Sequence, residues 1–286
     1  ERYGASCSVL EGEELLEENF PLIHAVAQTS QPPRLVEIVW NRYTNANGPK
    51  LTLIGTGISV NSGDAVSSPY HILMKKDMGG AAHALALAQM IMMVGLPVQL
   101  RVLIPIVEKS ISGCPMRLDV LRSRKGLTVE VGNIDTEGRL ILADALTAAC
   151  EGEPDLVIDC STLTTAASIA LGNEIPALFS NHETWTQKLL HSSHSTEDPL
   201  WQLPLFRPYA RHLKSSVADL NNIGNSSYGG AITAALFLEH FIEPNIPWIH
   251  IDTMAWNPVA APGRPEGGDA MGLRALFHLI HQWVMV

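Results

Sequence analysis

Hydrophobic positions along this chain fall into short apolar runs that alternate with longer segments whose apolar residues recur at helical spacing. The runs have the length of buried strands and lie at residues 35–40, 51–54, 98–106, 127–131, 156–159, 177–179 and 248–251. Segments with helical spacing lie at residues 78–94, 140–149, 162–171, 183–191, 231–241 and 270–284. This alternation is typical of an α/β protein, so we predict a mixed, largely parallel sheet flanked by helices on both faces.

The organisation along the chain predicts one large folded unit. With 286 residues, of which 46% are hydrophobic and 17% charged, the chain can bury a sizeable core. It begins at Glu1 without a methionine, and the first predicted strand starts at residue 35. We therefore predict a leader or linker over residues 1–34 and a single domain over residues 35–286.

Charge and cysteine usage narrow the class of protein. A formal net charge of −10 argues against binding to nucleic acid or to acidic membranes. The apolar helix predicted at residues 78–94 is interrupted by His83 and Gln89, which favours a core helix over a membrane span. The four cysteines, Cys7, Cys114, Cys150 and Cys160, show no C-x-x-C spacing and are expected to be reduced. We predict an intracellular protein, cytoplasmic or of an organellar matrix such as the mitochondrial one, and not a secreted one.

A segment that follows the predicted strand at residues 127–131 gathers residues suited to metal chemistry. Asp135 and Glu137 are two positions apart, so an extended backbone would aim both carboxylates at one side. Hard oxygen ligands of this kind suit a divalent cation, and the planar donor fork of Arg139 suits a carboxylate or a developing oxyanion. The same residues also fit an ordinary turn and the acidic first turn of a solvated helix. The segment alone leaves both interpretations open.

Two ordered motifs resolve that question through a resemblance. N-I-D-T-E-G-R-L at residues 133–140 and M-K-K-D-M-G-G-A-A at residues 74–82 resemble N-T-D-A-E-G-R-L and M-K-x-D-M-G-G-A-A of the leucyl aminopeptidase (cytosol aminopeptidase) metallopeptidases. The likeness continues through D-C-S-T-L-T-T-A-A at residues 159–167, where the family has a D-x-A-T-L-T-G-A-like turn. It also extends through residues 219–224, 230–235 and 248–252.

The resemblance implies the fold of a leucyl aminopeptidase catalytic domain over residues 35–286. In the family this domain follows a separate N-terminal domain, so residues 1–34 are expected to be a leader or linker from such a domain, which is missing here. It implies that Asp77, Asp135 and Glu137 are metal ligands and that Arg139 is catalytic. It also implies a homo-oligomer, a hexamer in the family, with peptides as substrates if the chain is active. The proline- and glycine-rich loop at residues 256–268 is a candidate for packing near a site or an interface.

One family segment is altered in this chain. The family has G-K-G-x-x-F-D-x-G-G and then a further lysine, which supply a metal-binding lysine, a bridging aspartate and a catalytic lysine. Aligning the glycines of residues 55–63 and the following proline places Thr56, Asn61 and Ser68 at those three positions. This alignment requires a two-residue deletion before Asp77.

An ungapped alignment back from Asp77 instead places Ile54, Ser59 and Val66 there, so both lysines and the aspartate are absent either way. Lys50 would restore part of an active site only if the fold brought it into the pocket.

These substitutions predict a weakened catalytic centre. An amide at Asn61 cannot neutralise two metals as a bridging aspartate does, so we expect either no metal or a single Mn²⁺, Zn²⁺ or Mg²⁺. Losing a lysine that donates protons or stabilises charge would remove a factor of about 10²–10⁴ in rate. We therefore predict a catalytically impaired homologue that serves as a structural or binding subunit of an oligomeric assembly. The alternative is an active metal-dependent aminopeptidase that releases N-terminal residues from peptides.

Several further residues carry narrower expectations. Thr136 and Thr165 add bulk where the family keeps small residues, which either narrows the pocket or is absorbed by a small backbone shift. Asp159 is predicted to cap the helix that follows it. The eleven histidines include no H-x-x-x-H or H-E-x-x-H arrangement, so all of them, His83 and His250 included, are predicted to be satisfied or surface residues rather than ligands.

Overall fold

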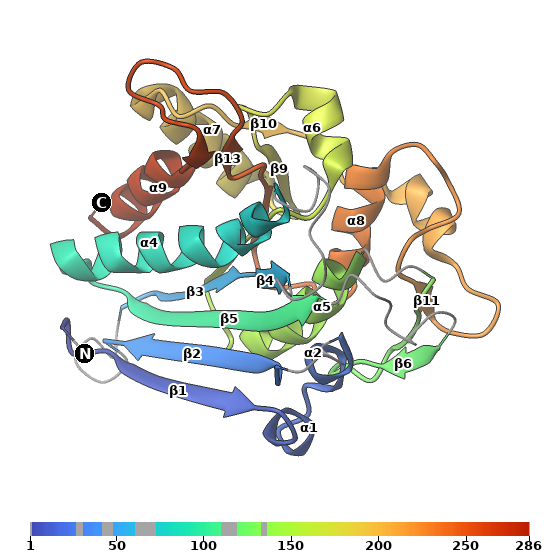
Figure 1. Ribbon diagram of the computed structural model, residues 1–286. Coiled ribbons are helices and arrows are strands. Elements are labelled where there is room, and N and C mark those ends of the chain that lie inside the picture. Colours follow the sequence, from blue (N-terminus) through green and yellow to red (C-terminus); the bar gives the residue numbers. More distant parts are fainter. Residues whose placement is uncertain are drawn as a thin grey trace.

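A mixed, largely parallel sheet forms the centre of the molecule (Figure 1). The computed structural model describes residues 2–26, 31–41, 48–60, 73–109, 119–132 and 136–285. In these residues the strands of the main sheet are β1 (Ser6–Glu11), β2 (Arg34–Trp40), β3 (Lys50–Gly55), β4 (Gly57–Val60), β5 (Gln99–Lys109), β8 (Leu156–Ser161), β9 (Ala177–Ser180), β10 (Trp201–Gln202) and β12 (Trp248–Asp252). Their order is β1-β2-β5-β3-β8-β12-β9-β10, and β4 pairs with β5.

Parallel pairing dominates the middle of this sheet. Strands β5, β3, β8 and β12 run parallel to one another, whereas β1, β2 and β9 each pair antiparallel with a neighbour. The predicted sheet type is therefore confirmed. The apolar run predicted at residues 127–131 does form a strand, β7 (Thr128–Glu130), but it lies in a small separate sheet with β6 (Val120–Arg122) and β11 (Leu220–Asn221).

The helices cover both faces of the sheet, as predicted. Those described are α1 (Glu14–Glu17), α2 (Pro21–Val26), α4 (Gly79–Val94), α5 (Glu137–Cys150), α6 (Thr165–Leu171), α7 (Glu183–Thr196), α8 (Gly230–Glu239) and α9 (Leu273–Met285), with 3₁₀ turns η1 (Met74–Met78) and η3 (Arg207–Leu213). Side chains alternate along each strand, so Ile158 of β8 packs toward α4, α7 and α9 while its neighbour Val157 packs toward α5 and α8.

Helix α4 is a core helix. By length and composition alone the stretch Met74–Val94 could also cross a membrane. Its Leu87 and Ile91 are fully buried, however, in the cluster that α4 forms with the sheet and α9. A one-sided contact of this kind is what a helix covering a buried sheet requires.

The segment before β2 contributes to the same sheet and core. Strand β1 pairs with β2 from Ser6 opposite Val39 to Glu11 opposite Arg34. Leu15 of α1 and Leu22 of α2 are fully buried. Residues 6–26 lie within the segment predicted as a leader or linker, yet they pack as an integral edge of this fold.

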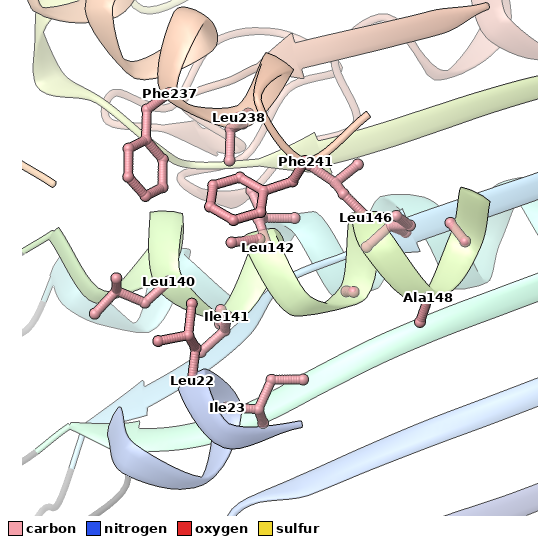
Figure 2. Close-up of a cluster of buried hydrophobic side chains, with 14 of the residues drawn as sticks. Leu22, Ile23, Leu140, Ile141, Leu142, Leu146, Ala148, Phe237, Leu238 and Phe241 are labelled. Carbon is pink, nitrogen blue, oxygen red and sulfur yellow. The ribbon is translucent and has the colours of Figure 1, made fainter. Parts of the chain in front are cut away.

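Helix α5 is buried on all sides between α2 and α8 (Figure 2). The buried Asp144 in its middle accepts hydrogen bonds from the backbone N–H groups of Leu22 at 2.7 Å, Ile23 at 3.3 Å and Arg124 at 2.8 Å. The bonds from Leu22 and Ile23 satisfy N–H groups in the first turn of α2, which have no partner within the helix. Burial nevertheless raises the pKa of Asp144 to about 7, against the opposing effect of these hydrogen bonds.

The Asp144 pKa predicts a specific pH dependence of stability. Because the folded-state pKa lies above that of the unfolded chain, the stabilising contribution is complete below about pH 4 and is lost as pH rises through about 7. The stability advantage of the wild type over Asp144→Asn, which cannot titrate, should therefore shrink by about 2–3 kcal/mol between pH 5 and pH 8. Urea unfolding at the two pH values measures it. An advantage that grows with pH would show that the three N–H donors dominate and that the carboxylate is stable as an anion.

Candidate functional site

The candidate site is a pocket of about 200 Å³ at the carboxyl ends of the parallel strands. Thr56 follows β3, Ser161 ends β8 and Thr253 follows β12, and all three line the pocket. Side chains at the carboxyl ends of neighbouring parallel strands meet at one edge, where α/β sheets bind their ligands.

Asp77 reaches this pocket from η1, immediately before α4. Its Oδ1 accepts a hydrogen bond from the Thr162 hydroxyl at 2.6 Å and lies 2.5 Å from Lys76 Nζ. The neighbouring Lys75 turns away and places its Nζ over the Trp256 ring, 4.8 Å from the ring centroid. Of the two consecutive lysines, only Lys76 therefore puts its charge beside Asp77.

Two glycines allow α4 to start this close to the strand ends. A Cβ on Gly80 would lie 2.4 Å from the Cys160 carbonyl oxygen, and a Cβ on Gly55 would lie 2.3 Å from the Gly80 carbonyl oxygen. Neither position has room for a side chain, so glycine at Gly55 and at Gly80 is a packing requirement. The Ala81 N–H donates to the Thr56 carbonyl at 2.8 Å and fixes the contact.

Glu137 lines the same pocket from the opposite side, as the first residue of α5. Glu137 is nearly buried, with only 8% of its surface exposed. The structure thus brings together two of the three predicted metal ligands, Asp77 and Glu137. The third, Asp135, lies outside the described residues, and within them no group of three or more His, Cys, Asp or Glu side chains is placed to hold a metal ion.

Arg139 is buried but does not line the pocket. Its Nη1 donates to the main-chain carbonyl of Asn222. Burial lowers the pKa of Arg139 to about 10, and Asp252 partly opposes this shift. In this arrangement the guanidinium supports the fold around α5, and the catalytic role expected for it stays a prediction.

Asn222 is a positioning residue that the sequence interpretation missed. It is fully buried, its Oδ1 accepts from the Gly132 N–H at 2.9 Å, and its Nδ2 donates to the Thr136 hydroxyl at 2.6 Å. Thr136 is the N-cap residue of α5, so Asn222 holds the chain before the helix to the start of the helix. The pattern of apolar residues gives no signal for such a bond, because the partners are 86 and 90 positions away.

The altered family positions are only partly within the described residues. Thr56 is 1% exposed and forms part of the pocket lining, whereas Asn61 and Ser68 lie outside the described residues. Lys50 starts β3 at the other end of the strand, where its Nζ donates to the Gly152 carbonyl. It therefore does not substitute for either family lysine.

The prediction that Asp159 caps a helix is wrong. Asp159 is fully buried within β8, and its carboxylate accepts from Trp248 Nε1 and pairs with His250 Nδ1, each at 2.6 Å. Burial lowers the pKa of His250, but the adjacent Asp159 carboxylate outweighs it, so the net shift is upward. Thr164 is the residue that caps α6: its hydroxyl accepts from the Ala167 N–H.

His83 fits the prediction of a satisfied histidine, whereas His250 is satisfied on Nδ1 alone and its buried Nε2 has no hydrogen-bond partner among the described residues. His83 is hydrogen-bonded on both ring nitrogens, to the Gly79 carbonyl at 2.7 Å and the Met271 N–H at 3.0 Å. His250 is held through Nδ1 by Asp159. The three described cysteines, Cys7, Cys150 and Cys160, are free thiols.

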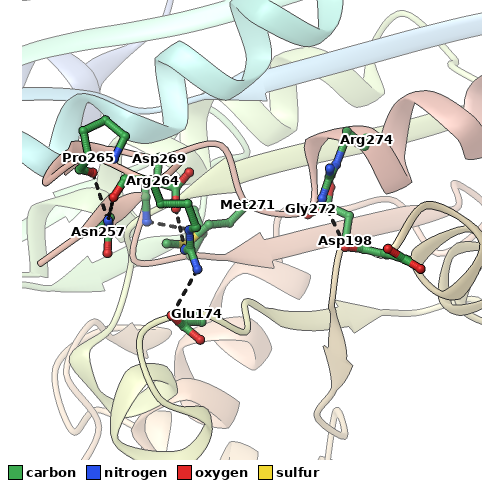
Figure 3. Close-up of polar contacts among 12 residues, drawn as sticks. Glu174, Asp198, Asn257, Arg264, Pro265, Asp269, Met271, Gly272 and Arg274 are labelled. Atoms are coloured by element: carbon green, nitrogen blue, oxygen red, sulfur yellow. Dashed lines mark hydrogen bonds and ion pairs between the residues drawn. The ribbon is translucent and has the colours of Figure 1, made fainter. Parts of the chain in front are cut away.

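The proline- and glycine-rich loop is docked on the body of the protein (Figure 3). Asn257 Nδ2 donates to the Arg264 carbonyl, and the Arg264 guanidinium pairs with Glu174 at 3.0 Å and with Asp269 at 2.6 Å. The short strands β13 (Trp256–Asn257) and β14 (Gly267–Gly268) close the loop at its base. Beyond it, Asp198 accepts from the Gly272 and Arg274 N–H groups where α9 begins.

Comparison with known proteins gives a consistent result. The family model described as "Cytosol aminopeptidase family, catalytic domain" matches residues 1–277. A probable cytosol aminopeptidase of Syntrophotalea carbinolica is 42% identical over 285 residues, which cover 98% of this chain and 57% of the relative. Peptidase B of Pectobacterium carotovorum is 38% identical over 96% of this chain and 65% of its own length.

Solved structures show the same likeness. The cytosol aminopeptidase of Coxiella burnetii superposes with a TM-score of 0.92 at 49% identity, covering 99% of this chain and 62% of that protein. The bottromycin maturation enzyme BotP in complex with Mn superposes with a TM-score of 0.89 at 33% identity. The match covers 99% of this chain and 63% of that protein. This chain therefore spans somewhat less than two thirds of the length of these similar proteins.

The Asn222 contacts generate a stability prediction. Asn222→Ala leaves the Gly132 N–H and the Thr136 hydroxyl without this partner in a buried place, which should lower the free energy of unfolding by about 1–3 kcal/mol. The matched control is Asn221→Ala, at the neighbouring position, in β11. The Asn221 Oδ1 accepts an exposed N–H, so its removal should lower the free energy of unfolding by less than about 0.5 kcal/mol. Urea unfolding of both variants measures the difference, and equal losses would remove the special role given to Asn222.

Proposed function

This chain belongs to the cytosol aminopeptidase family, and from that premise we propose that its pocket releases N-terminal residues from peptides with the help of a divalent metal ion. The observation that carries the proposal is the convergence of Asp77 and Glu137, from two different helix starts, on one pocket at the carboxyl edge of the sheet. The names of the relatives as aminopeptidases and peptidases support it.

The residues present fit a single hard cation. Asp77 and Glu137 offer carboxylate oxygens toward the same space, and Asp135 is the third ligand in this proposal. Carboxylates suit Mn²⁺ and Mg²⁺, and they also serve Zn²⁺. When bound, such an ion would supply Lewis acidity toward the scissile carbonyl. The similar structure described in complex with Mn supports Mn²⁺ as the ion to test first.

The chain's own residues can bind and orient a peptide N-terminus. The carboxylates of Asp77 and Glu137 attract the terminal ammonium group, and Thr162 holds Asp77 in one orientation through its 2.6 Å hydrogen bond. Lys76, 2.5 Å from Asp77, adds a positive charge that can stabilise negative charge developing on the carbonyl oxygen. The pocket is built from the ends of rigid strands, which keeps these groups in fixed positions.

A second candidate is a non-catalytic homologue that binds peptides or other subunits. Thr56 is the specific observation that favours it: a hydroxyl stands at the position aligned with the family's metal-binding lysine, and it is buried in the pocket. A threonine carries no charge at neutral pH and donates a proton far less readily than an ammonium group. The comparisons do not support this impairment, because the relatives carry the names of peptidases.

We also propose an assembly and a cellular location, both from membership of the family. We propose that the chain forms a homo-oligomer, hexameric as the resemblance implies, or belongs to a larger complex. Both fit a family known to form oligomers. The relatives named cytosol aminopeptidases support an intracellular location.

Activity measurements separate the two candidates. With Mn²⁺ supplied, purified protein should hydrolyse a leucyl amide reporter, and a chelator should abolish the reaction reversibly. Glu137→Gln should lower kcat/KM by about 10²–10⁴, because it removes a charged ligand at the reacting centre. Glu183→Gln is the matched control, since Glu183 is likewise the first residue of a helix but lies on the surface at α7. Wild-type turnover no greater than that of Glu137→Gln would favour the non-catalytic candidate.

A further inference from the structure

Four positions in the pocket differ from the family motifs in the same chemical direction. In the alignment made on the glycines, Thr56 stands where the family has lysine. Thr136 and Ser161 stand where it has alanine, and Thr165 where it has glycine. All four residues line the pocket. Each substitution places a hydroxyl group where the family has an amine, a methyl group or no side chain.

Ser161 is the most informative of the four. Its side chain ends β8 and the residue is 1% exposed, yet among the described residues its Oγ has no hydrogen-bond partner. A buried hydroxyl without a partner costs free energy, so such a group in a pocket lining points to a partner other than the described residues, and a ligand of the pocket would be such a partner.

Thr56 lies beside Ser161 at the base of the pocket. A Cβ built on Gly80 would lie 2.8 Å from Thr56 Oγ1 and 3.0 Å from Ser161 Cα, so both residues approach the same point of the α4 start. Both are 1% exposed. Two hydroxyl groups are thus gathered in a nearly dry place beside the start of α4.

Other hydroxyls of the pocket are already engaged. Thr162 donates to Asp77, Thr164 donates to Asp252, and Thr136 accepts from Asn222, each at 2.6 Å. These three hydroxyls orient protein groups. The Ser161 hydroxyl differs because no comparable contact holds it.

We propose that this pocket selects peptides whose N-terminal residue carries a hydrogen-bonding side chain, such as threonine or serine, over peptides with an apolar N-terminal residue. The Ser161 hydroxyl, with Thr56 beside it, is the group that makes the distinction. A site with an unpaired buried polar group favours the ligand that pairs with it over an isostere that cannot. The inference rests on the proposed function in taking the ligand to be a peptide N-terminus.

The test compares two ligands that differ by one hydroxyl. Threonyl and valyl dipeptide analogues, with a methylene-amine in place of the scissile amide, cannot be hydrolysed and are nearly isosteric. Calorimetric titration of purified protein in the presence of Mn²⁺ should give a threonyl affinity on the order of tenfold tighter than the valyl affinity. Ser161→Ala, which restores the family residue, should reduce this ratio to within about threefold of unity.

The control variant is Ser195→Ala. The Ser195 hydroxyl donates to the His191 carbonyl on exposed α7, so its loss should leave the threonyl to valyl ratio unchanged. Equal or tighter binding of the valyl analogue by the wild type, or no binding of either, would overturn the proposal. A wild-type preference that survives in Ser161→Ala would overturn the assignment to Ser161.

Stability provides a second readout on the same variant. Because the Ser161 hydroxyl has no described partner in the ligand-free protein, Ser161→Ala should melt at the same temperature as the wild type or higher. A clear fall in melting temperature would show that the hydroxyl serves the fold instead. Turnover of reporter peptides is measured separately, so a threonyl preference without hydrolysis would refute the proposed reaction and leave this selectivity standing.

Discussion

The close approach of the α4 start to the ends of β3 and β8 is the constraint on which the site depends. It exists because Gly55 and Gly80 carry no Cβ, and a Cβ on either would overlap a carbonyl oxygen of its neighbour. With the helix this near, Asp77, just before it, reaches the hydroxyl of Thr162, the residue that follows β8. The apolar packing of α4 against the sheet then holds the helix rigidly, so the carboxylate is positioned by the core of the protein.

The opposite wall of the pocket is fixed by polar contacts. Helix α5 is buried along its whole length, which leaves its N-terminal turn no solvent to satisfy it. Asn222 instead fixes the residues around the helix start: it donates to the Thr136 hydroxyl, accepts from the Gly132 N–H, and accepts the Arg139 guanidinium on its main-chain carbonyl. Glu137 therefore enters the pocket from a helix start that cannot shift without breaking buried hydrogen bonds. The pocket is acidic on both walls and lined with hydroxyls between them.

Sequence patterns predicted most of this fold, because long apolar runs and helical spacing report burial directly. They placed the main parallel strands and the helices that cover them, and the family motifs placed Asp77 and Glu137 at one site. They misassigned Asp159, because a charged residue inside a strand is stable only with partners such as His250, which pairs with it from 91 positions away. The likeness to the family runs through residues 219–224, but the role of Asn222 within them was missed, because its bonds depend on tertiary contacts with residues 86 and 90 positions away.

The central claim is that Asp77 and Glu137 form one ligand-binding centre at the carboxyl edge of the sheet. Anomalous diffraction from crystals soaked in Mn²⁺, collected on both sides of the manganese absorption edge, tests it most directly. The account predicts one peak within coordination distance of both carboxylates, with the Lys76 ammonium moved away from Asp77. A peak elsewhere, or none at Mn²⁺ concentrations that support hydrolysis, would contradict it.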